Sequence, residues 1–130
     1  MIQRCIFFGL LNFALSSFII SQTPLDSLKI SAASGDAEAQ NYLGVCFEHG
    51  DGINKDLKQA VVWFQKSAAQ GNLAAQCNLG NCYFYGFGTD VNKKAAFYWF
   101  MKSAEKGFAK AQYNLGICYE RGEGVEKILI

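Results

Sequence analysis

The sequence repeats itself with a period of 36 residues. Three segments align without a gap: "GDAEAQNYLGVCFEHGDGI" from Gly35, "GNLAAQCNLGNCYFYGFGT" from Gly71 and "GFAKAQYNLGICYERGEGV" from Gly107. A second block aligns "KQAVVWFQKSAAQ" from Lys58 with "KAAFYWFMKSAEK" from Lys94, and "SLKISAAS" upstream is a shorter, degraded copy. A fixed period of this size predicts a solenoid of helical pairs, in which each unit buries its apolar face only against its neighbours.

The spacing of apolar residues predicts two helices in each repeat. Ala39, Leu43 and Cys46 step by four and then three residues, which makes one stripe of an amphipathic helix over 37–48. A second helix is expected over 56–69, and paired glycines in G-x-G spacing supply the turn between the two. We call the first helix of each repeat its first-type helix and the second its second-type helix. The expected domain spans 22–127, with a degraded helix at 24–34, repeats at 35–70 and 71–106, and a partial repeat at 107–130.

The ends of these helices carry recognisable signals. In "TPLD", Thr23 is expected as an N-cap, Pro24 at the first helical position and Asp26 near the positive end of the helix dipole. Gly35 and its copies stand where a helix must stop, because glycine adopts the left-handed conformation beyond a helix end without steric cost.

The first 21 residues differ in composition from the rest. After Arg4, the stretch "CIFFGLLNFALSSFII" carries no charge and is followed by the polar "SQTP". A basic start, an apolar middle and a polar exit are typical of a secretory signal peptide. We therefore expect residues 1–21 to be a signal peptide and the mature chain to be secreted, periplasmic or lumenal. The alternative is an uncleaved membrane anchor, although the run is shorter than the roughly 20 residues that span a bilayer comfortably.

Charge and reactive side chains argue against several classes of function. Twelve basic and eleven acidic residues nearly cancel, and no Lys/Arg run forms the basic stripe that nucleic-acid binding needs. His49 is the only histidine, which argues against Ser-His-Asp catalysis, Cys-His catalysis and a metal centre. The glycine pairs follow a helix and lack the G-K-[ST] ending of a phosphate loop. We predict no catalytic residue, metal, cofactor or nucleic-acid partner.

The segments "AEAQNYLGVCFEHGDGINKD" and "KQAVVWFQKSAAQGN" resemble the Sel1-like repeat family, which is related to the tetratricopeptide repeats. The resemblance covers Leu25 to Lys127. It implies an all-α, right-handed α-α solenoid that acts as a non-catalytic adaptor for a protein or peptide partner. Because the chain stops at "GVEKILI", where a further second-type helix would begin, we expect one face of the last first-type helix to be partly uncovered.

The cysteines are expected to be structural. The resemblance implies a disulfide between cysteines eight positions apart in disulfide-rich members, but here Cys77 is preceded at that distance by Ala69. Cys46, Cys82 and Cys118 lie one repeat apart on the core stripe, which should exceed the ~7 Å between Cα atoms that a disulfide allows. We expect them to act as small buried hydrophobic residues.

Two sets of positions in the first-type helices vary between repeats, while the adjacent stripe hardly changes. In tetratricopeptide-like stacks this helix lines the concave side, so these positions would face a groove for a peptide. The alternative is that they are inter-helix packing without a ligand. The residues are Asn41, Cys77 and Tyr113 in one set, and Val45, Asn81 and Ile117 in the other.

Repeat 2 ends its first helix with "YFYGFG", where the other repeats have "FEHGDG" and "YERGEG". Phe84, Tyr85 and Phe87 thus replace charged or polar residues. Exposed, they would form an apolar patch of the kind that marks an interaction site. The alternative is that they fold under neighbouring loops.

The sequence therefore predicts an exported adaptor that binds its partner in the concave groove or through the aromatic patch. The alternative function, implied by some secreted relatives, is a small-molecule binder for cell-wall or β-lactam compounds with weak hydrolase activity. The chain offers no nucleophile with a base beside it for that reaction.

Overall fold

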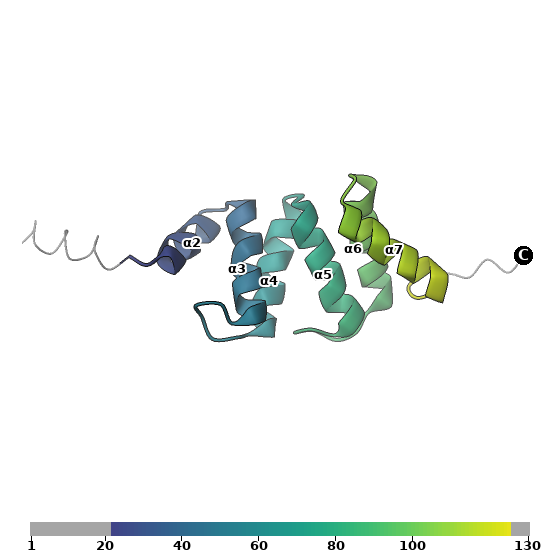
Figure 1. The fold of residues 1–130 in the computed structure, drawn as a ribbon, viewed down its shortest axis with the longest axis horizontal. Helices are drawn as coiled ribbons and strands as arrows, with labels where there is room; N and C mark the ends of the chain where they lie inside the picture. Colours follow the sequence, from purple (N-terminus) through teal and green to yellow (C-terminus); the bar gives the residue numbers. More distant parts are fainter. Residues whose placement is uncertain (1–21, 126–130) are drawn as a thin grey trace, which may run out of the picture.

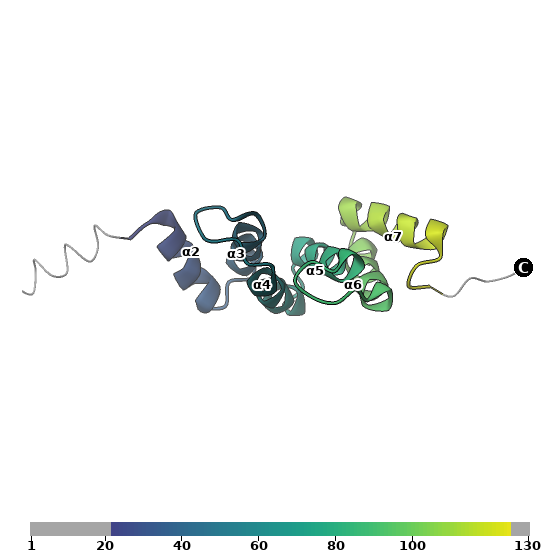
Figure 2. The same ribbon diagram turned by 90° about the horizontal axis from the view of Figure 1, so that it is seen from below.

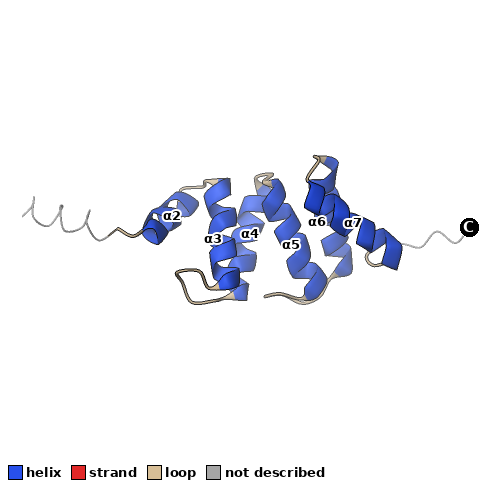
Figure 3. Ribbon diagram, viewed as in Figure 1, coloured by secondary structure: helices blue, strands red, loops and turns tan. Residues whose placement is uncertain are grey.

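The computed structural model describes residues 22–125, which form six helices and no strand. The helices are α2 (Pro24–Ala33), α3 (Ala37–His49), α4 (Leu57–Ala69), α5 (Leu73–Tyr85), α6 (Lys93–Glu105) and α7 (Ala109–Arg121). Consecutive helices pack against each other, and the stack runs in one direction from α2 to α7 (Figures 1 and 2). The colouring by secondary structure shows only helices and their connecting loops (Figure 3). The predicted all-α solenoid is confirmed.

The helix ends follow the predicted signals closely. Thr23 caps α2 through its side chain, which accepts a hydrogen bond from the Asp26 backbone N–H, while Asp26 reaches back to the Thr23 backbone. Pro24 is the first residue of that helix. The first-type helix of repeat 1 ends at His49, one residue later than predicted, and Gly50 follows with a φ of 76°. The next helix begins at residue 57, one later than predicted, because Asp56 is its N-cap.

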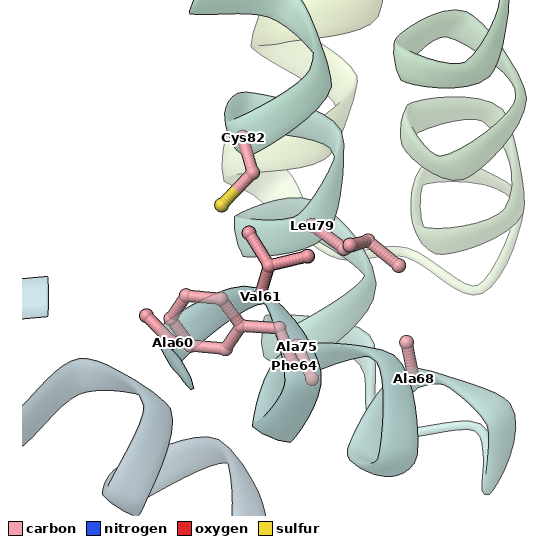
Figure 4. Close-up of a cluster of buried hydrophobic side chains, with 7 residues drawn as sticks. All are labelled: Ala60, Val61, Phe64, Ala68, Ala75, Leu79 and Cys82. Atoms are coloured by element: carbon pink, nitrogen blue, oxygen red, sulfur yellow. The ribbon is translucent and has the colours of Figure 1, made fainter. Parts of the chain in front are cut away.

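The core lies between the first-type and the second-type helices, and the same packing recurs in successive repeats. Phe64 on α4 and Phe100 on α6 are almost fully buried, and each ring lies against a glycine of the preceding helix. A Cβ atom at Gly44 would be 2.6 Å from Phe64, and one at Gly80 would be 2.5 Å from Phe100. These glycines allow the close approach of helix to ring. Figure 4 shows the cluster of Ala60, Val61, Phe64, Ala68, Ala75, Leu79 and Cys82 between α4 and α5.

Repeated polar side chains tie each helix to the next. Gln40, Gln76 and Gln112 each donate from Nε2 to a carbonyl oxygen eight residues earlier, at the end of the preceding second-type helix, over 3.1, 3.2 and 3.2 Å. Ser67 and Ser103, both fully buried, donate from Oγ to carbonyl oxygens at the start of α3 and α5. The glutamine bonds reach carbonyls of the last helical turn, which have no partner within their own helix. The serine bonds join the start of a first-type helix to the second-type helix that follows it.

The cysteines behave as predicted. Cys46, Cys82 and Cys118 are buried, and no cysteine among residues 22–125 forms a disulfide. On α7, a Cβ atom at Gly116 would meet none of residues 22–125 within 4 Å. The expected signal peptide lies outside the described residues. No helix in the described part of the chain has the length and apolar character to cross a bilayer.

Candidate functional site

A hollow of about 600 Å³ lies between α5 and α7, bordered on one side by the end of α3. We call it the groove. Residues from both helices and from the loop after α5 form its wall. They are Glu48, Cys77, Asn78, Asn81, Tyr85, Phe87, Ala109, Lys110, Tyr113 and Asn114. The groove lies along the first-type helices, where the variable positions predict a groove.

Most of the predicted residues come together in this groove. Cys77, Asn81, Tyr85, Phe87 and Tyr113 line it. This grouping joins the two predicted sites into one surface, because Tyr85 and Phe87 stand where α5 ends.

The other four predicted residues lie outside the groove wall: Phe84, described below, and Asn41, Val45 and Ile117. Asn41 is half-buried and accepts a hydrogen bond from Asn78 Nδ2 over 3.0 Å. Val45 and Ile117 pack against the hydrophobic clusters between helices. These contacts agree with the packing alternative for the two residues, and a role in binding stays a prediction.

A network of side-chain amides connects the first-type helices. Asn114 Nδ2 donates to Asn81 Oδ1 over 3.1 Å and lies 3.6 Å from the Cys77 sulfur. Sequence reasoning missed Asn78 and Asn114, as well as Glu48 and Lys110. A signal for the two asparagines was present, since each directly follows a variable position in "AQCNLG" and "AQYNLG".

The placement of Cys77 on the variable surface needs correction. Its side chain borders the groove but is only 2% exposed, because Asn114 and the neighbouring helix cover it. Burial raises the pKa of the Cys77 thiol. A thiol that stays protonated near neutral pH is a poor nucleophile, which argues against hydrolysis that depends on Cys77.

The interpretation of Phe84 as part of an exposed patch is wrong. Phe84 is 5% exposed and packs against Phe100, with 6.2 Å between ring centroids. The Lys93 amine lies 3.4 Å from the Phe84 ring centroid and donates to the Phe84 carbonyl oxygen over 2.9 Å. The residue is buried because α5 turns it toward α6.

The two other aromatic residues of repeat 2 are exposed. Tyr85 is 57% exposed and Phe87 is 42% exposed. Their rings are stacked, with 5.4 Å between centroids and 24° between planes. The apolar patch therefore consists of two rings at the end of the groove.

The groove wall presents polar, aromatic and charged side chains. It combines amide donors and acceptors, three partly exposed aromatic rings, and one charge of each sign from Glu48 and Lys110. His49 is exposed beside it, with Nε2 3.5 Å from Glu48 Oε2. Within residues 22–125, no three His, Cys, Asp or Glu side chains gather as metal ligands would.

The comparison with protein families identifies the repeat. The family model described as "Sel1 repeat" matches residues 37–72, 73–108 and 109–127. The chain belongs to the Sel1 repeat family. Sel1 repeat proteins are generally protein-interaction scaffolds, and the matched segments begin two residues later than the repeat boundaries predicted from the glycines.

Two solved structures share the Sel1 repeat fold. One is c5321, described as a protective antigen present in uropathogenic Escherichia coli strains; it is 37% identical with a TM-score of 0.76 over 78% of this chain. The other is a Sel1 repeat protein from Oxalobacter formigenes, 38% identical with a TM-score of 0.71 over 81% of this chain. This chain covers 22% of the first structure and 79% of the second.

Among curated proteins, a short segment is similar to DAP3-binding cell death enhancer 1 of Rattus norvegicus. The two are 40% identical over 38 residues, which is 29% of this chain and 8% of the rat protein. The similarity thus concerns about one repeat and a small part of the rat protein.

Proposed function

We propose that this Sel1 repeat protein is a non-catalytic adaptor that binds a peptide segment of a protein partner in the groove between α5 and α7. The observation that carries the proposal is the composition of the groove wall. Three of the six positions that vary between repeats, Cys77, Asn81 and Tyr113, line the groove together with the exposed Tyr85 and Phe87 and with side-chain amides, whereas the packing positions of the helices repeat. A surface that differs between repeats is expected where a common scaffold presents a specific contact.

The amides suit the backbone of an extended peptide. A peptide without secondary structure has unpaired N–H and C=O groups, and Asn78, Asn81 and Asn114 carry side chains that can both donate and accept. The hydrogen bond from Asn114 to Asn81 holds two of these amides in place before binding. Such preorganisation lowers the entropy that binding would otherwise cost.

The rings suit an apolar or aromatic side chain of the same peptide. Tyr85 and Phe87 are stacked on each other, and Tyr113 is 72% exposed on α7. Exposed aromatic residues beside polar groups are enriched at the centres of protein interfaces. The name of the rat relative describes binding to another protein, which supports the view that the partner is a protein.

The proposed setting is outside the cytoplasm, after removal of residues 1–21. The uncharged stretch after Arg4 and the polar exit before Thr23 support this assignment. Mass spectrometry of the secreted or periplasmic protein should find an N-terminus near Gln22. An intact Met1 in the membrane fraction would contradict cleavage and favour the anchor.

Affinity capture with paired variants tests the groove. Immobilised protein is incubated with extract from the native source, and bound proteins are identified by mass spectrometry. Tyr85→Ala removes a ring from the groove, whereas Tyr98→Ala removes a comparably exposed ring from α6, outside it. We expect a specific partner to be lost with Tyr85→Ala and kept with Tyr98→Ala. Equal binding by both variants would contradict the groove, provided that circular dichroism shows both to be folded.

A further inference from the structure

The two ends of the described solenoid expose helices of opposite type. Within a repeat, the first-type helices α3 and α5 are covered by the second-type helices α4 and α6. Among the described residues, α7 is a first-type helix without such a cover, and α2 is a second-type helix without a first-type helix before it. Each end therefore lacks what the other end presents.

Some residues of α7 are less buried than their counterparts in α3 and α5. They are the residues that face the second-type helix in the complete repeats. A Cβ atom at Gly116 would meet no atom of the described part of the chain within 4 Å, whereas Gly44 and Gly80 lie against Phe64 and Phe100. The Gln112 side chain is exposed, although its counterparts 36 and 72 residues earlier are each 5% exposed. Leu115 is half-buried at a position where the earlier repeats have leucines that are 1% exposed.

On α2, the matching residues stand in the register of a second-type helix. Leu28 occupies the position of Phe64 and Phe100, and it is only half-buried. Ser31 occupies the position of Ser67 and Ser103 and is also half-buried. The hydroxyl groups of Ser67 and Ser103 donate to the Ala37 and Leu73 carbonyl oxygens over 2.6 and 2.8 Å. The third carbonyl in this series belongs to Ala109, on α7.

Two further pairs in the same register are chemically complementary. Inside the chain, Asn41 pairs with Asn78 and Cys77 pairs with Asn114. The next pair in the series joins Tyr113 to Tyr42 of a following copy, and these two rings are 72% and 62% exposed. Two exposed rings at opposite ends of the chain would bury each other, and in an assembled copy the apolar contact to a peptide in the groove would rest on Tyr85 and Phe87.

The second of these pairs carries opposite charges. Asn72 Nδ2 donates to Glu38 Oε1 over 3.1 Å inside the chain. The corresponding pair between copies is Lys110 with Asp36. An exposed Lys–Asp pair adds little binding energy, but it favours this register over one that opposes like charges.

We propose that α7 docks α2 of a second copy of this chain, so that copies assemble head to tail and continue the solenoid. Leu28 of one copy lies against Gly116 of the other, and Ser31 donates to the Ala109 carbonyl oxygen. The contact is heterologous, because different surfaces meet, so each copy keeps one free end and assembly proceeds to chains of copies. Leucine fills less space than phenylalanine and α2 is three residues shorter than α4, so the contact is weaker than its counterparts inside the chain and depends on concentration.

Light scattering during size-exclusion chromatography of the full chain tests the assembly. We expect the mass to rise above the 14.3 kDa of one chain as the protein goes from low micromolar to high micromolar concentration. Gly116→Arg should leave a single-chain mass throughout. Its own helix is preserved, because arginine is a better helix former than glycine and the site is open. Tyr98→Arg places the same side chain on α6, outside both ends and the groove, and should assemble as the parent does.

Cysteine cross-linking tests the register directly. One protein carries Ser31→Cys and the other carries Ala109→Cys, and they are mixed under mild oxidation. We expect a disulfide-linked pair of chains in the mixture and not in either protein alone.

Any one of three results would overturn the proposal. The parent protein could keep a single-chain mass at all concentrations, Gly116→Arg could assemble as the parent does, or the mixture could form no cross-link. Partner capture in the groove is tested by Tyr85→Ala, so the two proposals fail separately.

Discussion

At the scale of single residues, Gly80 and Gly116 occupy the same position in successive repeats but have different surroundings. Gly80→Ala places a methyl group against the buried Phe100 ring, and such overpacking destabilises a core by ~1–3 kcal/mol. Gly116→Ala meets open space and should stabilise α7 by about 0.5–1 kcal/mol. Urea unfolding at a protein concentration too low for assembly measures both changes. Shifts of the same sign would contradict the close helix–ring packing.

The aromatic residues of repeat 2 should separate into a core residue and surface residues. Phe84→Ala should destabilise the fold by ~3 kcal/mol or more, because it empties a buried site next to Phe100. Tyr85→Ala should change stability by less than ~1 kcal/mol, because its ring is mostly exposed. Thermal unfolding of the two variants compares them, with Tyr98→Ala as the exposed control. Equal midpoints for Phe84→Ala and Tyr85→Ala would show that Phe84 is not part of the core.

The buried thiol of Cys82 should make stability fall at high pH. Burial, with a smaller contribution from the nearby Glu48 carboxylate, raises the pKa of Cys82 from 9.0 to about 12. The unfolded chain therefore loses this proton first, so the stabilising contribution is complete below pH ~9 and is lost as the pH rises toward ~12. Denaturant unfolding at pH 7, 9 and 10.5, roughly spanning that window, should show a steeper decline for the parent than for Cys82→Ala. Parallel declines would contradict the shift.

At the scale of helices, the N-caps show that a helix can begin without a capping side chain. Asn72 caps α5 by accepting a hydrogen bond from the Ala75 backbone N–H over 2.9 Å. Phe108 stands at the same position before α7, makes no such bond, and packs instead against the cluster around Phe100. Tertiary packing thus replaces the local cap in the third repeat.

Removing the cap of α5 should be measurable. Asn72→Ala should destabilise the protein by ~1 kcal/mol, because the Ala75 N–H loses its acceptor. Asn72→Ser keeps a capping oxygen and should lose much less, which makes it the matched control. The midpoint of urea unfolding provides the comparison. An unchanged midpoint for Asn72→Ala would mean that packing alone holds the start of α5.

At the scale of the whole molecule, stability should be highest in the middle of the stack. α4 and α5 are packed on both sides, whereas α2 and α7 each have a side without a neighbouring helix among the described residues. In a repeat array, each unit is stabilised by its neighbours, so end helices open more easily. Native-state hydrogen exchange should show the strongest protection in α4 and α5. Protection of α2 and α7 should rise with protein concentration if the ends meet, and uniform protection at low concentration would contradict this view.

The sequence by itself determined the architecture. The 36-residue period, the apolar stripe and the glycine positions predicted the number, order and bounds of the helices to within one residue in repeat 1. This succeeds because helix formation, capping and turns depend on residues that are close in the chain. The burial of Cys46, Cys82 and Cys118 followed from the same stripe.

The tertiary structure alone decided which variable side chains are exposed and which meet. Cys77 and Phe84 proved buried, and Asn78 and Asn114 joined Asn81 around the groove. A residue's exposure depends on which helix packs over it, and hence on the angle and distance between successive repeats. Those quantities arise from the packing of side chains across repeats, such as a phenylalanine ring on a glycine, and a period along the chain does not contain them.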